Sequence, residues 1–241
     1  LSRSHSGKED MPLYSGSLPD GEYVLTYKGK HTTFLWATAE YTYTYRFVID
    51  KTGPSYTLKA GTTSVSSGTY TNKQITYSVT DYKPWRILYK SPAASSYSSS
   101  YNTTYTVGAT SYNNGWWYFY AEDYYDNYNE TVRIYLDTIA PVGKVVNSAG
   151  YTVQNGEYTN KPVRYTATDT GGVSYYQVKK PGSSSWTSYS SGTTLSDSYG
   201  WYAFRCVDKA GNYSEEYKVY YDAILPVGTL YGGTTAMSSG S

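Results

Sequence analysis

Few residues of this chain are of a type that supports catalysis. Nucleophilic catalysis needs a base beside a serine or cysteine, and the 241 residues include two histidines, His5 and His31, and one cysteine, Cys206. Cys206 falls at an inward position of a predicted strand, where a free cysteine is usually an inert core thiol. No His/Cys spacing resembles a zinc site, and no glycine-rich phosphate loop follows a strand. We therefore predict no catalytic residue, no cofactor and no enzymatic activity.

Aspartates at the ends of predicted strands are the candidates for metal binding. Calcium takes six to eight oxygens, usually from several carboxylates, whereas each loop here offers one or two. Asp at a strand end also caps a turn through its own backbone. Turn capping is the favoured interpretation, calcium binding is the alternative, and no metal site is predicted. The aspartates concerned are Asp81, Asp123, Asp126, Asp169 and Asp208.

Aromatic residues are the candidates for partner binding, because the chain has 34 Tyr against 4 Phe and 6 Trp. Trp116 and Trp201 occupy equivalent positions and are predicted to point away from the core. They either pack across strands on the outer face of a sheet or form a platform for a ligand, since exposed Trp and Tyr are enriched in binding hot spots. Trp85 alternates with Ile87 and is expected in the core. The candidate partner-binding residues are Trp116, Trp201, Trp186, Tyr118 and Tyr120.

An internal repeat organises these residues. The pattern Asp-x-x-x-Pro begins at Asp50 and returns at Asp137 and Asp222, after 87 and then 85 residues. The block Gly115-Trp-Trp-Tyr-Phe119 likewise returns as Gly200-Trp-Tyr-Ala-Phe204. The predicted organisation is residues 1–50 as the C-terminal half of a repeat, 51–136 and 137–222 as full repeats, and 223–241 as the start of a further repeat or a flexible tail.

The alternation within each repeat is that of strands. Trp117, Phe119 and Ala121 are predicted to point inward, as are Tyr202, Phe204 and Cys206, because successive side chains of a strand face opposite sides. Turn signals such as Asp169-Thr-Gly-Gly172 punctuate the sequence. The predicted fold is all-β, with tandem immunoglobulin-like β-sandwich domains in an elongated array.

Composition excludes several classes of protein. The net charge is +1 with no basic run, so the cationic face that nucleic-acid binding needs is missing from the sequence. No stretch of 18 apolar residues occurs, and no membrane insertion is predicted. The first residue is Leu1 rather than Met, and we expect the chain to be a piece of a longer protein.

The sequence Cys206-Val-Asp-Lys-Ala-Gly-Asn212, followed by Asp222-Ala-Ile-Leu-Pro226, resembles the bacterial immunoglobulin-like repeats of Gram-positive surface proteins. Tyr158-Thr-Asn-Lys161 adds to the resemblance. It implies an extracellular location, on a bacterial surface or secreted, and a role as a stalk or an adhesive module. One repeat departs from the motif, with Asp123-Tyr-Tyr-Asp126-Asn127 in place of Asp-x-x-Gly-Asn, which places its turn geometry in question.

Three functions remain open at this stage. The leading hypothesis is a non-catalytic module that binds a host or extracellular partner, either a protein such as mucin or immunoglobulin or a glycan, through a Tyr/Trp-rich β surface. The alternatives are a purely structural stalk and an accessory region of a secreted enzyme. The abundance of tyrosine favours the first, because a spacer needs length and solubility rather than aromatic surface.

Overall fold

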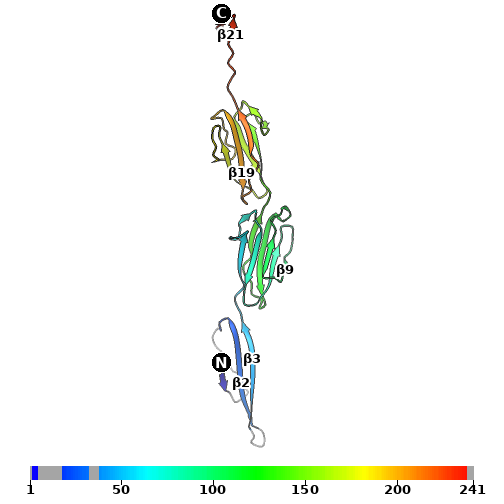
Figure 1. The fold of residues 1–241 in the computed structure, drawn as a ribbon. Coiled ribbons are helices and arrows are strands. Elements are labelled where there is room, and N and C mark those ends of the chain that lie inside the picture. The colour runs from blue at the N-terminus through cyan, green and yellow to red at the C-terminus, as the bar shows by residue number, and fades with distance from the viewer. Residues whose placement is uncertain (1, 5–17, 33–37, 238–241) are drawn as a thin grey trace. The chain divides into compact units, whose positions relative to one another are not determined.

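Nearly every element of the chain is a β-strand (Figure 1). The computed structural model describes residues 2–4, 18–32 and 38–237, so His5 lies outside the described residues. Within them, the one helical element is a short 3-10 turn, η1 (Ser111–Asn113), and no helix is long and apolar enough to cross a membrane. The all-β prediction is confirmed, since residues 55–136 and 142–221 form two sandwich-like domains.

The first sandwich has a four-stranded sheet of order β10-β7-β4-β5 and a five-stranded sheet of order β6-β12-β11-β8-β9. Tyr77 and Phe119, one from each sheet, are both fully buried and stack with ring centroids 5.2 Å apart. The inward positions predicted for Trp117 and Ala121 are confirmed, at 6% and 0% exposure. The strands are β4 (Ser55–Ala60), β5 (Thr63–Ser64), β6 (Tyr70–Thr71), β7 (Ile75–Thr80), β8 (Pro84–Lys90), β9 (Ser98–Ser100), β10 (Thr104–Val107), β11 (Gly115–Asp123) and β12 (Val132–Leu136).

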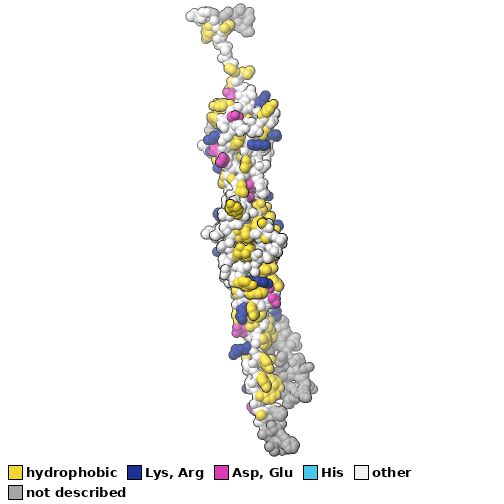
Figure 2. Space-filling view, turned by 90° about the vertical axis from the view of Figure 1, so that its right-hand side faces the viewer, with side chains coloured by type: hydrophobic (Ala, Val, Ile, Leu, Met, Phe, Trp, Pro, Cys, Tyr) yellow, Lys and Arg dark blue, Asp and Glu magenta, His cyan; other side chains and the backbone are white. Residues whose placement is uncertain are grey.

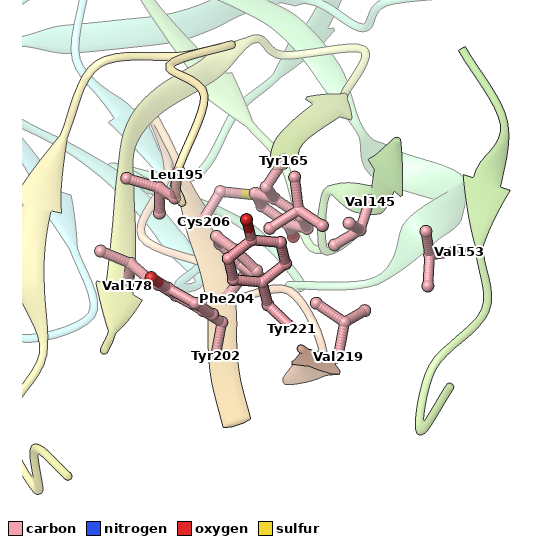
Figure 3. Packing of buried hydrophobic residues seen from close by; sticks show 11 residues of the cluster. Val145, Val153, Tyr165, Val178, Leu195, Tyr202, Phe204, Cys206, Val219 and Tyr221 are labelled. Atoms are coloured by element: carbon pink, nitrogen blue, oxygen red, sulfur yellow. The ribbon is translucent and has the colours of Figure 1, made fainter. Parts of the chain in front are cut away.

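The second sandwich pairs a sheet of order β14-β13-β16 with one of order β15-β20-β19-β17-β18. Figure 3 shows its core, in which Tyr165 and Phe204 stack with ring centroids 5.4 Å apart. Burying each such ring contributes roughly 1.5–3 kcal/mol. The strands are β13 (Val142–Asn147), β14 (Thr152–Val153), β15 (Tyr158–Thr159), β16 (Val163–Thr168), β17 (Val173–Lys179), β18 (Thr187–Tyr189), β19 (Gly200–Asp208) and β20 (Tyr217–Tyr221).

Cys206 lies in this core, as predicted, with no exposed surface. Its backbone N–H donates to the Ser214 hydroxyl at 2.9 Å, and that hydroxyl is 3.1 Å from the Tyr165 hydroxyl. Burial raises the pKa of the Cys206 thiol, which keeps it protonated and unreactive.

The last strand of each sandwich pairs in parallel with a two-residue strand. In the second sandwich, β15 pairs with β20 and places Tyr158 beside Tyr220. In the first, β6 pairs with β12 and places Tyr70 beside Tyr135. The backbone hydrogen bonds around these pairs match between the sandwiches: Gly68 N to Arg133 O, Tyr135 N to Thr69 O and Asp137 N to Thr71 O in one, and Gly156 N to Lys218 O, Tyr220 N to Glu157 O and Asp222 N to Thr159 O in the other.

Before the first sandwich, β2 (Gly21–Thr32) and β3 (Thr38–Ile49) form a long hairpin, and β1 (Ser2–Ser4) adds to β2 in parallel. Tyr23 pairs with Phe47 in this hairpin, in the register that pairs Tyr202 with Val219 in the second sandwich. Val219 is fully buried, whereas Phe47 is 42% exposed. The hairpin therefore has the strand pairing of the end of a repeat, and the described residues provide no second sheet that covers it as in a sandwich.

After the second sandwich, residues 223–229 form no strand and Val227 is 94% exposed. The short hairpin of β21 (Leu230–Gly232) and β22 (Thr235–Met237) follows. The sequence predicted the start of a further repeat or a flexible tail at residues 223–241, and the structure has a two-stranded hairpin there over residues 230–237.

Candidate functional site

Three aromatic side chains meet on the outer face of the second sandwich. Trp201 points outward because its neighbour Tyr202 points into the core, and it pairs across β19 and β20 with Tyr220. The ring centroids are 5.3 Å apart for Trp201 and Tyr220, 5.6 Å for Tyr158 and Trp201, and 4.8 Å for Tyr158 and Tyr220. Tyr158 is 70% exposed and Trp201 is 42% exposed. We refer to Tyr158, Trp201 and Tyr220 as the second aromatic triad.

The first sandwich has a matching set, the first aromatic triad, in Tyr70, Trp116 and Tyr135. Its centroid distances are 5.2 Å for Trp116 and Tyr135, 5.4 Å for Tyr70 and Trp116, and 4.8 Å for Tyr70 and Tyr135. Here the Arg133 guanidinium lies 4.5 Å from the centroid of the Trp116 ring, and the Lys209 ammonium lies 5.2 Å from that of Tyr70. Trp116 is half-buried, and both its ring and that of Tyr70 already have a cation over one face.

Among the residues that the structure describes, no cation lies over the Trp201 ring as Arg133 lies over that of Trp116. Lys218 occupies the position equivalent to Arg133, and its ammonium pairs with Glu216 at 3.0 Å instead. The matching geometry of the triads comes from the repeat, and the difference comes from this one basic residue. The structure thus leaves Trp201 more accessible than its equivalent Trp116.

The other predicted partner-binding residues pack among their neighbours. Trp186 lies in a serine-rich loop and is half-buried between Lys179 and Arg205, whose charged groups lie 4.5 Å and 4.3 Å from the ring centroid. Tyr118 and Tyr120 point outward from β11 and are half-buried: the Lys90 ammonium lies 4.7 Å from the Tyr118 ring, and Tyr97 meets Tyr120 edge to face at 5.1 Å. In the view of Figure 2, hydrophobic side chains on the surface outnumber charged ones, which stand mostly singly.

Carboxylates from three separate segments converge at one end of the second sandwich. Asp137 follows β12, Asp169 follows β16, and Asp208 ends β19. One oxygen from each lies within 4.8 Å of one oxygen from each of the others. All three belong to one compact unit, made of residues 60–75, 107–117 and 133–241. We call this set the second carboxylate cluster.

Asn212 connects two of the three members of this cluster. Its amide nitrogen donates to Asp208 Oδ2 at 2.7 Å and to the backbone oxygen of Asp137 at 2.9 Å. Burial raises the pKa of Asp137, and the charges of Asp169 and Asp208 raise it further, while the Ile139 N–H acts in the opposite direction. The carboxylates therefore repel one another within a hydrogen-bonded frame.

The first carboxylate cluster, Asp50, Asp81 and Asp123, repeats this arrangement at one end of the first sandwich, again within 4.8 Å. Asn127 is the counterpart of Asn212 and donates to Asp123 Oδ2 at 2.9 Å and to the backbone oxygen of Asp50 at 3.1 Å. Burial raises the pKa of Asp81, with smaller contributions from Asp50 and Asp123 in the same direction.

Sequence reasoning identified four of these six aspartates as candidates and missed Asp50 and Asp137. Both stand at the start of the repeated Asp-x-x-x-Pro pattern, where they served as boundary markers. Their recurrence at one position of the repeat was the available signal. Each loop offers only one or two carboxylates, as expected, but the fold brings three segments together, and the third carboxylate comes from the segment that precedes each sandwich.

No protein-family model matches the chain, and no curated protein matches it. Among solved structures, the chain is similar to the fibronectin(III)-like modules of Clostridium thermocellum CbhA, with 15% identity over 74% of this chain and 100% of that chain, at a TM-score of 0.33. At this identity and TM-score the likeness adds nothing to the assignment of two sandwiches, which rests on the sheets themselves.

Proposed function

We propose that this chain is a non-catalytic, extracellular repeat module that binds a glycan, free or carried on a glycoprotein such as a mucin. The observation that carries the proposal is the second aromatic triad, with Trp201 42% and Tyr158 70% exposed on a sheet face. Exposed Trp and Tyr rings offer large, rigid contact area at a low cost in conformational entropy. The apolar C–H face of a sugar ring stacks on such a surface.

Polar groups beside the triad support this choice of ligand. Lys218 lies two residues before Tyr220 on β20, on the same face of the sheet, and pairs with Glu216 at 3.0 Å. A sugar presents hydroxyls around an apolar ring face, so rings bordered by an ammonium and a carboxylate complement it. A binding site of this kind joins apolar surface with a few directed polar groups.

The test is a glycan and mucin binding screen with the full chain and two matched variants. Trp201→Ala removes the centre of the second triad, and we expect binding to weaken by about 30-fold, the loss of a hot-spot residue worth about 2 kcal/mol. Trp116→Ala removes the equivalent residue of the first triad, whose ring is already covered by Arg133, and we expect less than about a threefold change. Circular dichroism of both variants shows whether the fold is intact.

A structural stalk is the competing function, and the first triad favours it. Trp116 packs between Tyr70 and Tyr135 with Arg133 over its ring, an arrangement that stabilises the sheet without a ligand. If the wild-type chain binds no glycan or mucin in the screen, both triads are sheet packing and the module is a stalk. Equal losses for the two tryptophan variants would also contradict the proposed site.

A further inference from the structure

The second carboxylate cluster contains a buried oxygen without a hydrogen-bond partner. Asp137 is 3% exposed, and its Oδ2 accepts no hydrogen bond. The Gly171 backbone approaches this oxygen so closely that a Cβ on Gly171 would lie 2.2 Å from it, and the Gly171 N–H acts to lower the pKa of Asp137 without giving Oδ2 a hydrogen-bond partner. Buried charges in proteins are paired or coordinate metals, because leaving one unpaired is costly. The protein therefore offers Oδ2 to a group from outside the chain.

Turn capping explains each aspartate separately but not their convergence. Asp137 Oδ1 accepts from Ile139 N at 3.0 Å, Asp169 Oδ2 accepts from Gly172 N at 2.7 Å, and Asp208 Oδ1 accepts from Asn212 N at 2.9 Å. None of these bonds requires three negative charges to share one site.

Ion pairing within the chain does not explain the convergence either. The ion pairs found among the described residues involve none of the three carboxylates. The ammonium of Lys209, next to Asp208, lies over the Tyr70 ring. Since no described residue supplies it, a cation that balances the cluster comes from solution.

We propose that Asp137, Asp169 and Asp208 bind one divalent cation and that this site selects Ca²⁺. The donors are all oxygens, which suit a hard cation rather than zinc, whose structural sites use Cys and His. Three carboxylates supply between three and six of the six to eight oxygens that Ca²⁺ takes, and water completes the shell. Mg²⁺ demands near-ideal octahedral geometry, which carboxylates fixed by turn hydrogen bonds satisfy less readily.

The first carboxylate cluster is the second instance of the same site. Asp50 Oδ2 is likewise buried without a hydrogen-bond partner, and Asn127 holds Asp123 and the Asp50 backbone as Asn212 does in the other cluster. Asp50 and Asp81 also line a surface pocket, which gives an ion a path to them. The chain therefore binds two Ca²⁺ ions, one per cluster.

The position of Asp137 indicates what the ion does. Asp137 belongs to the segment between β12 and β13, while Asp169 and Asp208 lie at strand ends of the second sandwich. A cation shared by the three carboxylates fastens that segment to these strand ends and removes their mutual repulsion. Calcium at this site thus stiffens the entry of the chain into the sandwich.

The test is a calorimetric Ca²⁺ titration of the full chain after treatment with a chelator. We expect two ions to bind to the wild type, in the range of about 0.1–1 mM that is usual for extracellular modules. Asp137→Asn should bind one ion, and so should Asp169→Asn, whose partly exposed side chain makes it the milder change. The matched control is Asp222→Asn: Asp222 begins the same pattern and accepts from Ile224 N at 2.8 Å, but it belongs to no carboxylate cluster among the described residues. This control should bind two ions.

The outcomes separate clearly. Loss of one ion in both cluster variants, with two retained in the control and circular dichroism unchanged, supports the site. Failure of the wild type to bind Ca²⁺ at about 10 mM, well above that range, overturns it. Two ions retained in Asp169→Asn with the fold intact also overturn it, and equal affinity for Mg²⁺ overturns the choice of calcium.

Discussion

Replacing Asn212 with alanine should destabilise the second sandwich by about 3 kcal/mol. The change deletes the bond from the side-chain amide to Asp208 Oδ2 at 2.7 Å and the bond to the backbone oxygen of Asp137 at 2.9 Å. Asp208 is 2% exposed, so the first is a bond to a buried charge, worth about 1.5–3 kcal/mol, and the second contributes about 1 kcal/mol. Total stabilities of about 5–15 kcal/mol make this a large loss.

The assay is urea unfolding followed by circular dichroism, with a chelator present so that no bound cation contributes. Asn127→Ala removes the equivalent bonds, at 2.9 Å and 3.1 Å, in the first cluster and should cost a similar amount in the first sandwich. Asn102→Ala is the control, because Asn102 is exposed and surface changes of this kind stay within about 0.5 kcal/mol. A loss below about 1 kcal/mol for Asn212→Ala would refute the view that this amide holds the cluster together.

Three further outcomes follow from the fold. Asp126 has a φ of +64° where the sister loop has glycine. Asp126→Gly should therefore stabilise the first sandwich by about 0.5–1 kcal/mol, measured by urea unfolding. A destabilisation would contradict this interpretation of the turn. Burial raises the pKa of Tyr202 to about 12 and raises that of Tyr165 further. Both folded-state pKa values lie above the unfolded-state value near 10. The free energy of unfolding therefore has its full value below about pH 10 and falls above it by up to about 1.4 kcal/mol per pH unit for each tyrosine. A urea midpoint constant from pH 9 to pH 11 would count against that prediction. Cys206 should resist a thiol reagent in the folded chain and react after unfolding, and Cys206→Ala should cost only about 1–2 kcal/mol, because the other sandwich has Ala121 at this position.

The sequence predicted the strands and their inward faces well because both depend on local alternation. Trp117, Phe119 and Ala121 alternate over a strand whose outer neighbours are also aromatic, and period two alone was enough to orient them. The same rule failed for Trp85, which was expected in the core with Ile87. Trp85 is half-buried near the start of β8, with the Arg86 guanidinium 4.0 Å from its ring centroid.

Backbone hydrogen bonds establish the geometry of the turn around Asp126, which the sequence left in question. Asp123 N donates to Asn127 O at 3.1 Å, as Asp208 N does to Asn212 O at the same distance. The backbone therefore follows one path in both repeats, and Asp126 adopts the left-handed conformation that Gly211 provides in the sister loop. The departure from the motif changes the energy of the turn rather than its shape.

The candidate sites were harder to predict because they depend on contacts between distant segments. Arg133 lies over the Trp116 ring and Arg205 over the Trp186 ring, and each pair comes from two separate segments of the chain. No spacing in the sequence indicates which aromatic ring has a cation over it. The carboxylate clusters likewise combine aspartates from three segments. The repeat predicts that such sites occur in equivalent places, but only the fold shows which residues meet.

The short parallel strands β6 and β15 determine how each sandwich responds to tension along the chain. Backbone hydrogen bonds join residues 156–159 to residues 218–222, and matching bonds join residues 68–71 to residues 133–137. When force is applied between the end of the last strand and the chain just before the short strand, it acts parallel to the strands. All of these bonds are then loaded at the same time. The β2–β3 hairpin, pulled from the two strand ends away from its turn, opens one pair at a time. Each sandwich therefore resists tension in a shear geometry, whereas the hairpin opens in an unzipping geometry. Equal rupture forces for the two geometries in single-molecule pulling would contradict this contrast.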